Sequence, residues 1–239
     1  MNYKGNPEYK HGCPSCTGIL ITNLGTPDKP TASSVRKYLA EFLSDPRIIE
    51  LPKYLWWLVL HGVILRIRQS RSAKAYKKIW TESGSPLLSI SKKQVLGLKK
   101  ILTEKVQGPI KIKLSMRYGN PSIKSELNKL RELNANRILV LPLYPQYSAA
   151  TTASTFDAIT DELKKWRWLP EVRMINHYHD DPDYINALTN SIEDHWQNNS
   201  RPQKLIFSFH GLPKHYFLAG DPYHCECHKT ARLVAEKLK

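Results

Sequence analysis

One histidine stands where a predicted apolar strand ends, in KLIFSFHGLPKHY at 204–216. Imidazole titrates near neutral pH and is a common metal ligand, so His210 could accept a proton or bind a metal ion. The Gly-Leu-Pro that follows predicts a sharp turn that holds the ring in one orientation. A hydrogen-bonded structural histidine is the alternative. We therefore treat His210 as the candidate catalytic and metal-binding residue.

Four cysteines occur as two pairs, one before the first predicted strand and one after the His210 turn: Cys13, Cys16, Cys225 and Cys227. Four thiolates would suit a zinc or iron–sulfur site. The pairs flank opposite ends of the predicted sheet, so we do not expect an iron–sulfur cluster, although a flexible N-terminus could still join them. A second option is a metal bound by the later pair with its neighbours His224 and His228, and the alternative is a solvated loop.

The spacing of apolar residues predicts the elements that carry these side chains. Five segments have the composition of strands bounded by turn residues: 18–25, 110–119, 137–148, 204–211 and, more weakly, 172–180. Five other segments have apolar residues at helical spacing: 33–44, 89–106, 122–134, 154–166 and 182–197. Strand and helix alternate, so the sequence predicts an α/β fold, a parallel sheet with helices on both faces.

Polar and aromatic residues follow each predicted strand, and ligands of open α/β sheets bind beyond the carboxyl ends of the strands. The residues expected at that edge are Asn23, Gly25, Arg117, Tyr118, Tyr144, Gln146, Tyr147, His177, His179 and His210. Their convergence predicts a binding site there. The sequence has neither a Gly-rich phosphate loop nor a G-x-S-x-G elbow, which excludes the chemistry of those motifs and leaves a flavin site open on topology alone.

The chain of 239 residues carries a formal charge of +15. This charge favours an anionic partner, which could be nucleic acid, a membrane surface or an acidic small molecule. Because no nucleic-acid motif accompanies the basic residues, we expect no nucleic acid, and a solvated basic face is the alternative to a specific anion site. The first residues contain no apolar core of signal-peptide length, so we expect a cytoplasmic protein.

Residues 46–86 interrupt the alternation of strand and helix, and their composition predicts a helical insertion that forms a lip. Within it, KYLWWLVLHGVILRIR at 53–68 joins two tryptophans to an apolar run that is too short to span a bilayer. Three interpretations stay open. The segment could lie on a membrane surface, form a buried core helix, or edge a hydrophobic ligand whose acidic groups meet Arg66 and Arg68.

Five blocks occur in an order that resembles the signature of ferrochelatase, the enzyme that inserts ferrous iron into a porphyrin to make haem. The blocks are NLGTP at 23–27, GSPL at 84–87, MRYGNP at 116–121, LPLYPQYSAATTAS at 141–154 and FSFHGLP at 207–213. Five ordered blocks across nearly the whole chain are far more specific than any single motif.

The resemblance implies a chelatase-type α/β fold built from flavodoxin-like half-domains. We expect residues 1–17 to form an N-terminal extension. The first half-domain should span about 18–150 and include the lip at 46–86. The second should begin at about residue 151 and be incomplete at residue 239.

The resemblance also implies roles for single residues. His210 matches the family's histidine at the metal-insertion site. Tyr144 matches a tyrosine lining the opposite side of the porphyrin cleft, Arg117 matches a cleft arginine, and Arg68 falls where the family carries an arginine near the porphyrin propionates. The lip at 51–68 resembles the family's hydrophobic edge, which would take up the macrocycle and contact the membrane peripherally.

The activity implied is conversion of protoporphyrin IX and ferrous iron to protohaem, with iron as a substrate and no prosthetic group. Family members continue beyond the helix after the His210 turn and carry there a glutamate that faces the histidine. No residue of this sequence corresponds to that glutamate, so a non-catalytic tetrapyrrole-binding relative is the alternative. Cys225 and the N-terminal extension through Cys16 also depart from the family pattern.

Overall fold

The computed structural model describes residues 3–6 and 9–239, so part of the expected extension at 1–17 lies outside the described residues. The chain divides into two compact units. Unit 1 comprises residues up to Leu143 together with Ala153–Ile175, and unit 2 comprises Tyr144–Thr152 together with Asn176–Lys239. Residues 153–175 join unit 1 because their strand completes its sheet. The half-domain boundary expected at about residue 151 stays a prediction.

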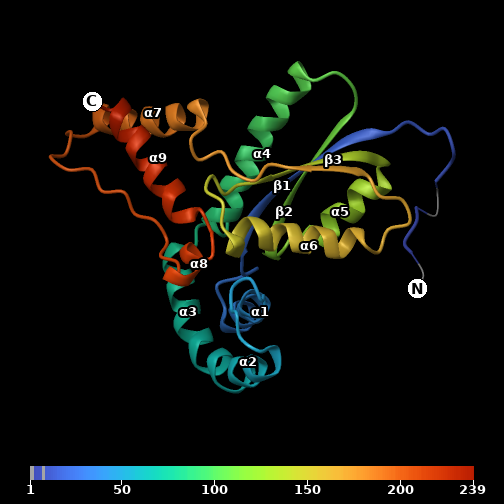
Figure 1. The fold of residues 1–239 in the computed structure, drawn as a ribbon, viewed down its shortest axis with the longest axis horizontal. Coiled ribbons are helices and arrows are strands. Elements are labelled where there is room, and N and C mark those ends of the chain that lie inside the picture. Colours follow the sequence, from blue (N-terminus) through green and yellow to red (C-terminus); the bar gives the residue numbers. More distant parts are fainter. Residues whose placement is uncertain (1–2, 7–8) are drawn as a thin grey trace. The chain divides into compact units, whose positions relative to one another are not determined.

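Unit 1 contains a parallel sheet of four strands in the order β2-β1-β3-β4 (Figure 1). The strands are β1 (Cys16–Thr26), β2 (Ile110–Gly119), β3 (Ala135–Pro142) and β4 (Glu171–Met174). β3 ends at a proline, earlier than the predicted 148, because Pro142 and Pro145 lack the N–H that would continue the ladder. The weak strand predicted at 172–180 is also shorter and ends at Met174.

The strand order explains why helices cover both faces of this sheet. Crossovers between parallel strands are right-handed, so crossovers in opposite directions place their helices on opposite faces. The chain moves one way from β1 to β2 through α4 (Pro86–Lys105), and the other way from β2 to β4 through α5 (Ile123–Glu132) and α6 (Ser154–Leu163). Figure 1 shows α5 and α6 on one side of the strands and α4 on the other. The predicted α/β fold class is confirmed.

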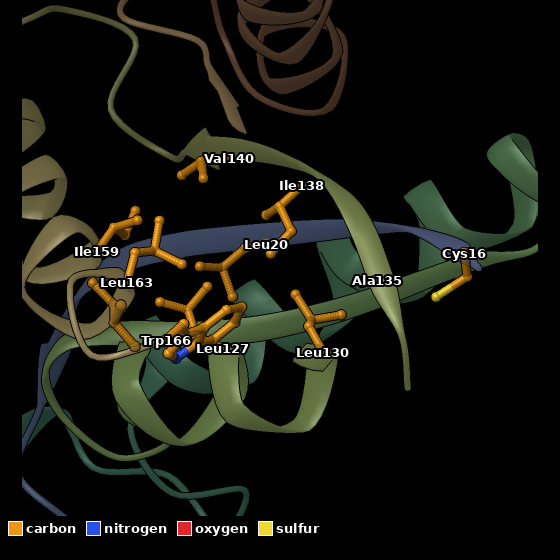
Figure 2. Close-up of a cluster of buried hydrophobic side chains, with 11 residues drawn as sticks. Cys16, Leu20, Leu127, Leu130, Ala135, Ile138, Val140, Ile159, Leu163 and Trp166 are labelled. Atoms are coloured by element: carbon orange, nitrogen blue, oxygen red, sulfur yellow. The ribbon is translucent and has the colours of Figure 1, made fainter. Parts of the chain in front are cut away.

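The main core of unit 1 lies between the sheet and helices α5 and α6 (Figure 2). Leu20 of β1 packs into one cluster with Leu127 and Leu130 of α5, and all three side chains are fully buried. Ile159 of α6 and Trp166 close the cluster. Burying a leucine side chain contributes about 1.5–3 kcal/mol, so this cluster holds the strands in place beneath the residues that follow them.

The segment predicted as a helical lip is helical throughout its apolar part. It forms α2 (Lys53–Val59), the π-helix η1 (Leu60–Ile64) and α3 (Leu65–Ile79). Leu60 and Leu65 pack with the last residue of α1 (Ala32–Leu43), and the Trp56 indole N–H donates to the Leu43 carbonyl oxygen at 2.6 Å. This small second core anchors one side of the segment in unit 1.

Unit 2 contains α7 (Pro182–Asn198), α8 (Lys214–Leu218) and α9 (Tyr223–Lys237), and most of the π-helix η2 (Ala149–Ala153). Helix α7 begins where predicted, because Asp181 accepts hydrogen bonds from two amides of its first turn. The 144–152 segment is tied to the α8–α9 turn by Asp221, which accepts from the Ser148 hydroxyl at 3.0 Å and the Ala149 amide at 2.8 Å.

The prediction of a strand at 204–211 is wrong. In the described part of the chain these residues form no strand, and Ile206 is 85% exposed. Alternating apolar residues favour a strand only when a neighbouring strand pairs with the main chain, and no described strand pairs with this segment. A solvated loop was the alternative to a metal site at the second cysteine pair, and the structure places Cys225 and Cys227 in α9 instead.

Candidate functional site

The NLGTP block lies at the carboxyl end of β1 in unit 1, where local contacts hold Asn23 and Gly25 in place. The Asn23 side chain accepts from the Leu24 amide at 2.8 Å and donates to the Ser91 hydroxyl at 3.0 Å. Gly25 has a φ of +110°, and a Cβ there would overlap the Tyr118 carbonyl oxygen of β2. Only glycine fits this position, since it tolerates positive φ and leaves room for the neighbouring strand.

A buried carboxylate organises the residues at the carboxyl end of β2. Asp45 accepts hydrogen bonds from the Tyr118 hydroxyl at 2.7 Å and the Ser154 hydroxyl at 2.6 Å. The Arg117 guanidinium contacts the same Asp45 oxygen at 2.5 Å and donates to Ser154 at 2.6 Å. We call these four residues the Asp45 cluster, and all of them belong to unit 1.

Charge and burial act in opposite directions on Asp45. Burial alone would raise the pKa of this carboxyl group, but hydrogen bonds from Ser154, Tyr118 and the Arg47 main chain, with the charge of Arg117, outweigh burial and lower it. Asp45 is therefore a buried anion held by fixed donors. Burial also raises the pKa of Tyr118, so its hydroxyl stays protonated and keeps donating.

The two arginines predicted to contact a porphyrin lie in unit 1 but in different surroundings. The Arg117 side chain is 17% exposed and its guanidinium is engaged by Asp45. Arg68 lies on α3 and is exposed to solvent. Arg117 is thus fixed in place, whereas Arg68 can turn toward an anionic ligand. Their contacts with a porphyrin remain predictions.

His210 lies in unit 2, on the wall of a cavity of about 630 Å³. A volume of this size is typical of small-molecule sites, which measure about 300–1,000 Å³. His210 is exposed, so solvent and ligands can reach it. The other rings around the cavity are aromatic or imidazole: Phe207, Phe209, Tyr216, Phe217, Tyr223, His224 and His228.

Tyr223 connects the His210 segment to helix α9. Burial, with a smaller effect of the Cys227 thiol, raises the pKa of Tyr223 to about 12, and a hydrogen bond from the His210 main chain opposes this rise. Burial raises the pKa of Cys227 as well, against a hydrogen bond from Tyr223. The fourth predicted residue, Tyr144, also belongs to unit 2, and its hydroxyl is shielded from solvent.

Two acidic residues of these sites were missed by the sequence interpretation. Asp45 follows the helix predicted at 33–44 and precedes a proline, and this pattern is typical of an ordinary helix end. Glu226 lies between two cysteines on α9, and its carboxylate contacts the rings of His177 and His179 from the segment that follows β4. Neither acid has a local signal, because the side chains that contact its carboxylate are more than 45 residues away in the sequence.

The surroundings of Cys16 and Cys227 favour the protonated thiol over the thiolate that a metal site requires. The Cys16 thiol is buried and donates to the Leu133 carbonyl oxygen at 3.2 Å, and burial raises its pKa. Cys16 belongs to unit 1 and the α9 cysteines belong to unit 2. A zinc or iron–sulfur site needs deprotonated cysteines, so the features of Cys16 and Cys227 favour a packing role.

We expect Cys225 to react with iodoacetamide at least about tenfold faster than Cys227, because alkylation needs an accessible thiolate. Cys225 is exposed, whereas Cys227 is 5% exposed and has a raised pKa. Mass spectrometry of timed digests measures both rates on the same chain. Equal rates in the folded protein would contradict the packing role, and equal rates after denaturation serve as the control.

The fold and these residues define an open α/β protein with polar sites beyond its strands. A family model described as ferrochelatase matches residues 16–239. Curated proteins named ferrochelatase are 53% identical in Thioalkalivibrio sulfidiphilus, 54% in Marinobacter nauticus and 54% in Nitrosococcus oceani, each over 238 residues. Each alignment covers all of this chain and 64% of the relative's length.

The chain belongs to the ferrochelatase family. The resemblance seen in the five sequence blocks is thereby confirmed. The chain spans a little under two thirds of the length of these relatives.

Proposed function

We propose that this chain takes part in inserting ferrous iron into protoporphyrin IX to form protohaem. The observation that carries the proposal is the match to the ferrochelatase family along residues 16–239. The exposed His210 beside an aromatic-lined cavity supports it, because the chemistry needs a base at the edge of a space for a large apolar ligand. Ferrous iron and the porphyrin are the substrates, and the reaction calls for no prosthetic group.

The reaction sets two physical requirements. Two pyrrole protons must leave the macrocycle, and the cation must exchange its water shell for the four nitrogens. We assign the first requirement to His210, whose imidazole can accept a proton and bind the metal on one side of the macrocycle. A macrocycle bound against the aromatic cavity walls would exclude water near the imidazole.

The basic residues would hold the acidic edge of the porphyrin. Arg68 is exposed on α3, which suits a contact with a propionate. Arg117 would present a fixed positive surface beside Asp45, and Tyr144 would line the cleft. The formal charge of +15 would favour the approach of a dicarboxylate substrate.

A bacterial strain whose own ferrochelatase is deleted, and which needs added haem, tests the proposal. The strain would express this chain alone, or this chain joined after Lys239 to the remaining C-terminal part of the Marinobacter relative. We expect the joined polypeptide to restore growth without haem. The complete Marinobacter protein is the positive control, and the chain alone shows what the 239 residues achieve.

Failure of the joined polypeptide to restore growth, when the Marinobacter protein restores it, would contradict the proposal. If the purified joined polypeptide nevertheless retained protoporphyrin, the non-catalytic tetrapyrrole-binding alternative would be favoured. Loss of both growth and porphyrin binding would reject both functions.

We also propose that the lip contacts a membrane peripherally, in a cytoplasmic protein. Among the described residues, none of the helices is long and apolar enough to cross a bilayer. The lip nevertheless exposes large apolar side chains, with Trp57 at 57%, Leu58 at 61% and Ile67 at 69%. Exposed apolar residues beside a basic helix favour a helix lying at the surface of an anionic membrane.

Replacing Trp57 and Leu58 together with serine is expected to weaken binding to vesicles containing anionic lipid by at least about tenfold. The reason is that burying each side chain contributes about 1.5–3 kcal/mol. Co-sedimentation with vesicles measures the change. Leu96→Ser, at an equally exposed site on α4, is the matched control and should bind as the parent does. Equal binding by all three proteins would contradict the membrane contact.

A further inference from the structure

We propose that His177, His179 and Glu226 form a binding site for one divalent transition-metal ion. The two histidines come from the segment between β4 and α7, and the glutamate comes from the first turn of α9. All three residues belong to unit 2, and the site does not include His210.

The three side chains already point their ligand atoms at one another. The Nδ1 atom of His177 lies 2.7 Å from Oε1 of Glu226, and Nδ1 of His179 lies 3.3 Å from Oε2. The three ligand atoms lie within 4.8 Å of one another. Bonds of about 2.0–2.1 Å to a tetrahedral ion place ligand atoms about 3.4 Å apart. A small movement of the exposed His177 would therefore close the site.

One buried atom in this cluster lacks a hydrogen-bond partner. His179 is 6% exposed, and its Nδ1 atom makes no hydrogen bond of acceptable geometry within the described structure. A buried polar atom left unsatisfied costs about 1–3 kcal/mol. Since Nδ1 faces the Glu226 carboxylate, a metal ion between them would satisfy both atoms.

The surrounding contacts orient the ligands as in established metal sites. The Tyr147 amide donates to Oε2 of Glu226 at 2.7 Å, and the Thr230 hydroxyl donates to the His179 carbonyl oxygen at 2.7 Å. On the other side of the His179 ring, Nε2 lies 3.9 Å from a carboxylate oxygen of Asp180. The first two contacts hold the Glu226 carboxylate and the main chain of His179 in place, as outer partners do in established metal sites.

The ligand types select the class of ion. Two imidazoles and one carboxylate suit zinc, cobalt, nickel or ferrous iron, whereas magnesium and calcium prefer sites made of oxygen atoms. Three protein ligands leave a fourth position open. The His177 side chain is 53% exposed, so that position can be filled by water.

An ion in this site would join parts of unit 2 that are distant in sequence. The ligands link the segment before α7 to α9, and Tyr147 links the 144–152 segment to the same carboxylate. Binding to the folded state alone stabilises that state. We therefore expect the ion to raise the thermal unfolding temperature of unit 2 as well as to bind.

Titration of the metal-free 239-residue chain with cobalt(II) alone tests the site. We expect one ion per chain, visible d–d absorption, and no thiolate-to-cobalt charge-transfer band, because the ligands are nitrogen and oxygen. His177→Ala and Glu226→Gln should each weaken binding by at least about tenfold and remove the thermal stabilisation. His177 is exposed and Gln keeps the shape of Glu, so both variants should fold.

Matched controls lie on the same helix and on α7. His224→Ala, Cys225→Ser and His195→Ala should bind cobalt as the parent does, and magnesium should not displace it. Unchanged binding in both His177→Ala and Glu226→Gln would overturn the proposal, as would a thiolate band that disappears in Cys225→Ser. Absence of stoichiometric binding by the parent chain would overturn it too, and would leave a hydrogen-bonded histidine–glutamate cluster.

Discussion

Replacing His210 with alanine is expected to lower the rate of iron insertion by at least about 10²-fold, which is the smaller contribution usual for a positioned base. His210 is exposed on the cavity wall, so its removal should leave the structure of unit 2 intact. Porphyrin affinity should change little, because the aromatic walls and basic residues that would hold the macrocycle remain. Insertion is measured anaerobically by haem absorbance, and binding by quenching of porphyrin fluorescence.

The control for this variant is His195→Ala, which removes an exposed imidazole on α7. This variant should insert iron at the parent rate, which would show that the loss of an exposed imidazole from unit 2 does not by itself slow insertion. If His210→Ala instead lost porphyrin binding and insertion to the same extent, His210 would be a structural residue rather than a base or metal ligand.

Replacing Asp45 with asparagine is expected to lower the free energy of unfolding by about 3 kcal/mol. Removing one partner of a buried ion pair typically costs about 3–5 kcal/mol, because the remaining charge is left uncompensated. The side chain of Asp45 is 3% exposed and that of Arg117 is 17% exposed. Asparagine keeps the shape of the residue but lacks the charge that holds Arg117.

Denaturant unfolding followed by tryptophan fluorescence measures this loss. Asp161→Asn is the control, since the Asp161 side chain on α6 is 69% exposed and its pairing with Lys164 should be worth less than about 1 kcal/mol. Similar losses from the two variants would show that the Asp45 cluster adds no more stability than a surface ion pair.

The stability lost in Asp45→Asn is also expected to depend on pH. The hydrogen bonds and charge around Asp45 lower its pKa below the ordinary value of about 3.9. A carboxyl whose pKa is lowered by folding stabilises the protein above its unfolded pKa and loses that effect as pH falls through its folded pKa. The stability difference between parent and Asp45→Asn should therefore be constant above about pH 5 and shrink below about pH 4. A difference that does not shrink in acid would contradict the assignment.

Local patterns were sufficient to predict the sheet and the helices that cover it. The helix predicted at 182–197 is α7, because a capping aspartate and a first-turn proline mark its start. The apolar run at 110–119 coincides with β2. Both signals come from neighbours in the sequence, so they survive without any knowledge of tertiary contacts.

The strand predicted at 204–211 shows where local patterns fail. Its residues have the right composition, but a strand requires a partner for its main chain, and composition does not report whether one is present. The sequence likewise indicated that His177 and His179 follow a strand, but it did not indicate that they contact the carboxylate of Glu226. Contacts between residues about 50 positions apart arise from the packing of α9, which no short motif encodes.

The role of Arg117 illustrates the same limit at the candidate site. Sequence blocks named this arginine as a cleft residue, and the structure adds that Asp45 and Ser154 already hold its guanidinium. A motif identifies which residues matter to a family, whereas only packing reveals which neighbour fixes each side chain. Asp45 is recognised as a site residue by the four groups that contact its carboxylate, and its place in the sequence gives no such indication.

The most direct test of the central claim is anaerobic conversion of protoporphyrin IX to haem, with ferrous iron supplied. The assay compares the 239-residue chain, the same chain joined to the C-terminal part of the Marinobacter relative, and the joined polypeptide carrying His210→Ala. We predict insertion above the uncatalysed rate by the joined polypeptide and its loss with His210. Insertion that persists without His210, or no insertion by a joined polypeptide that binds protoporphyrin, would contradict the account.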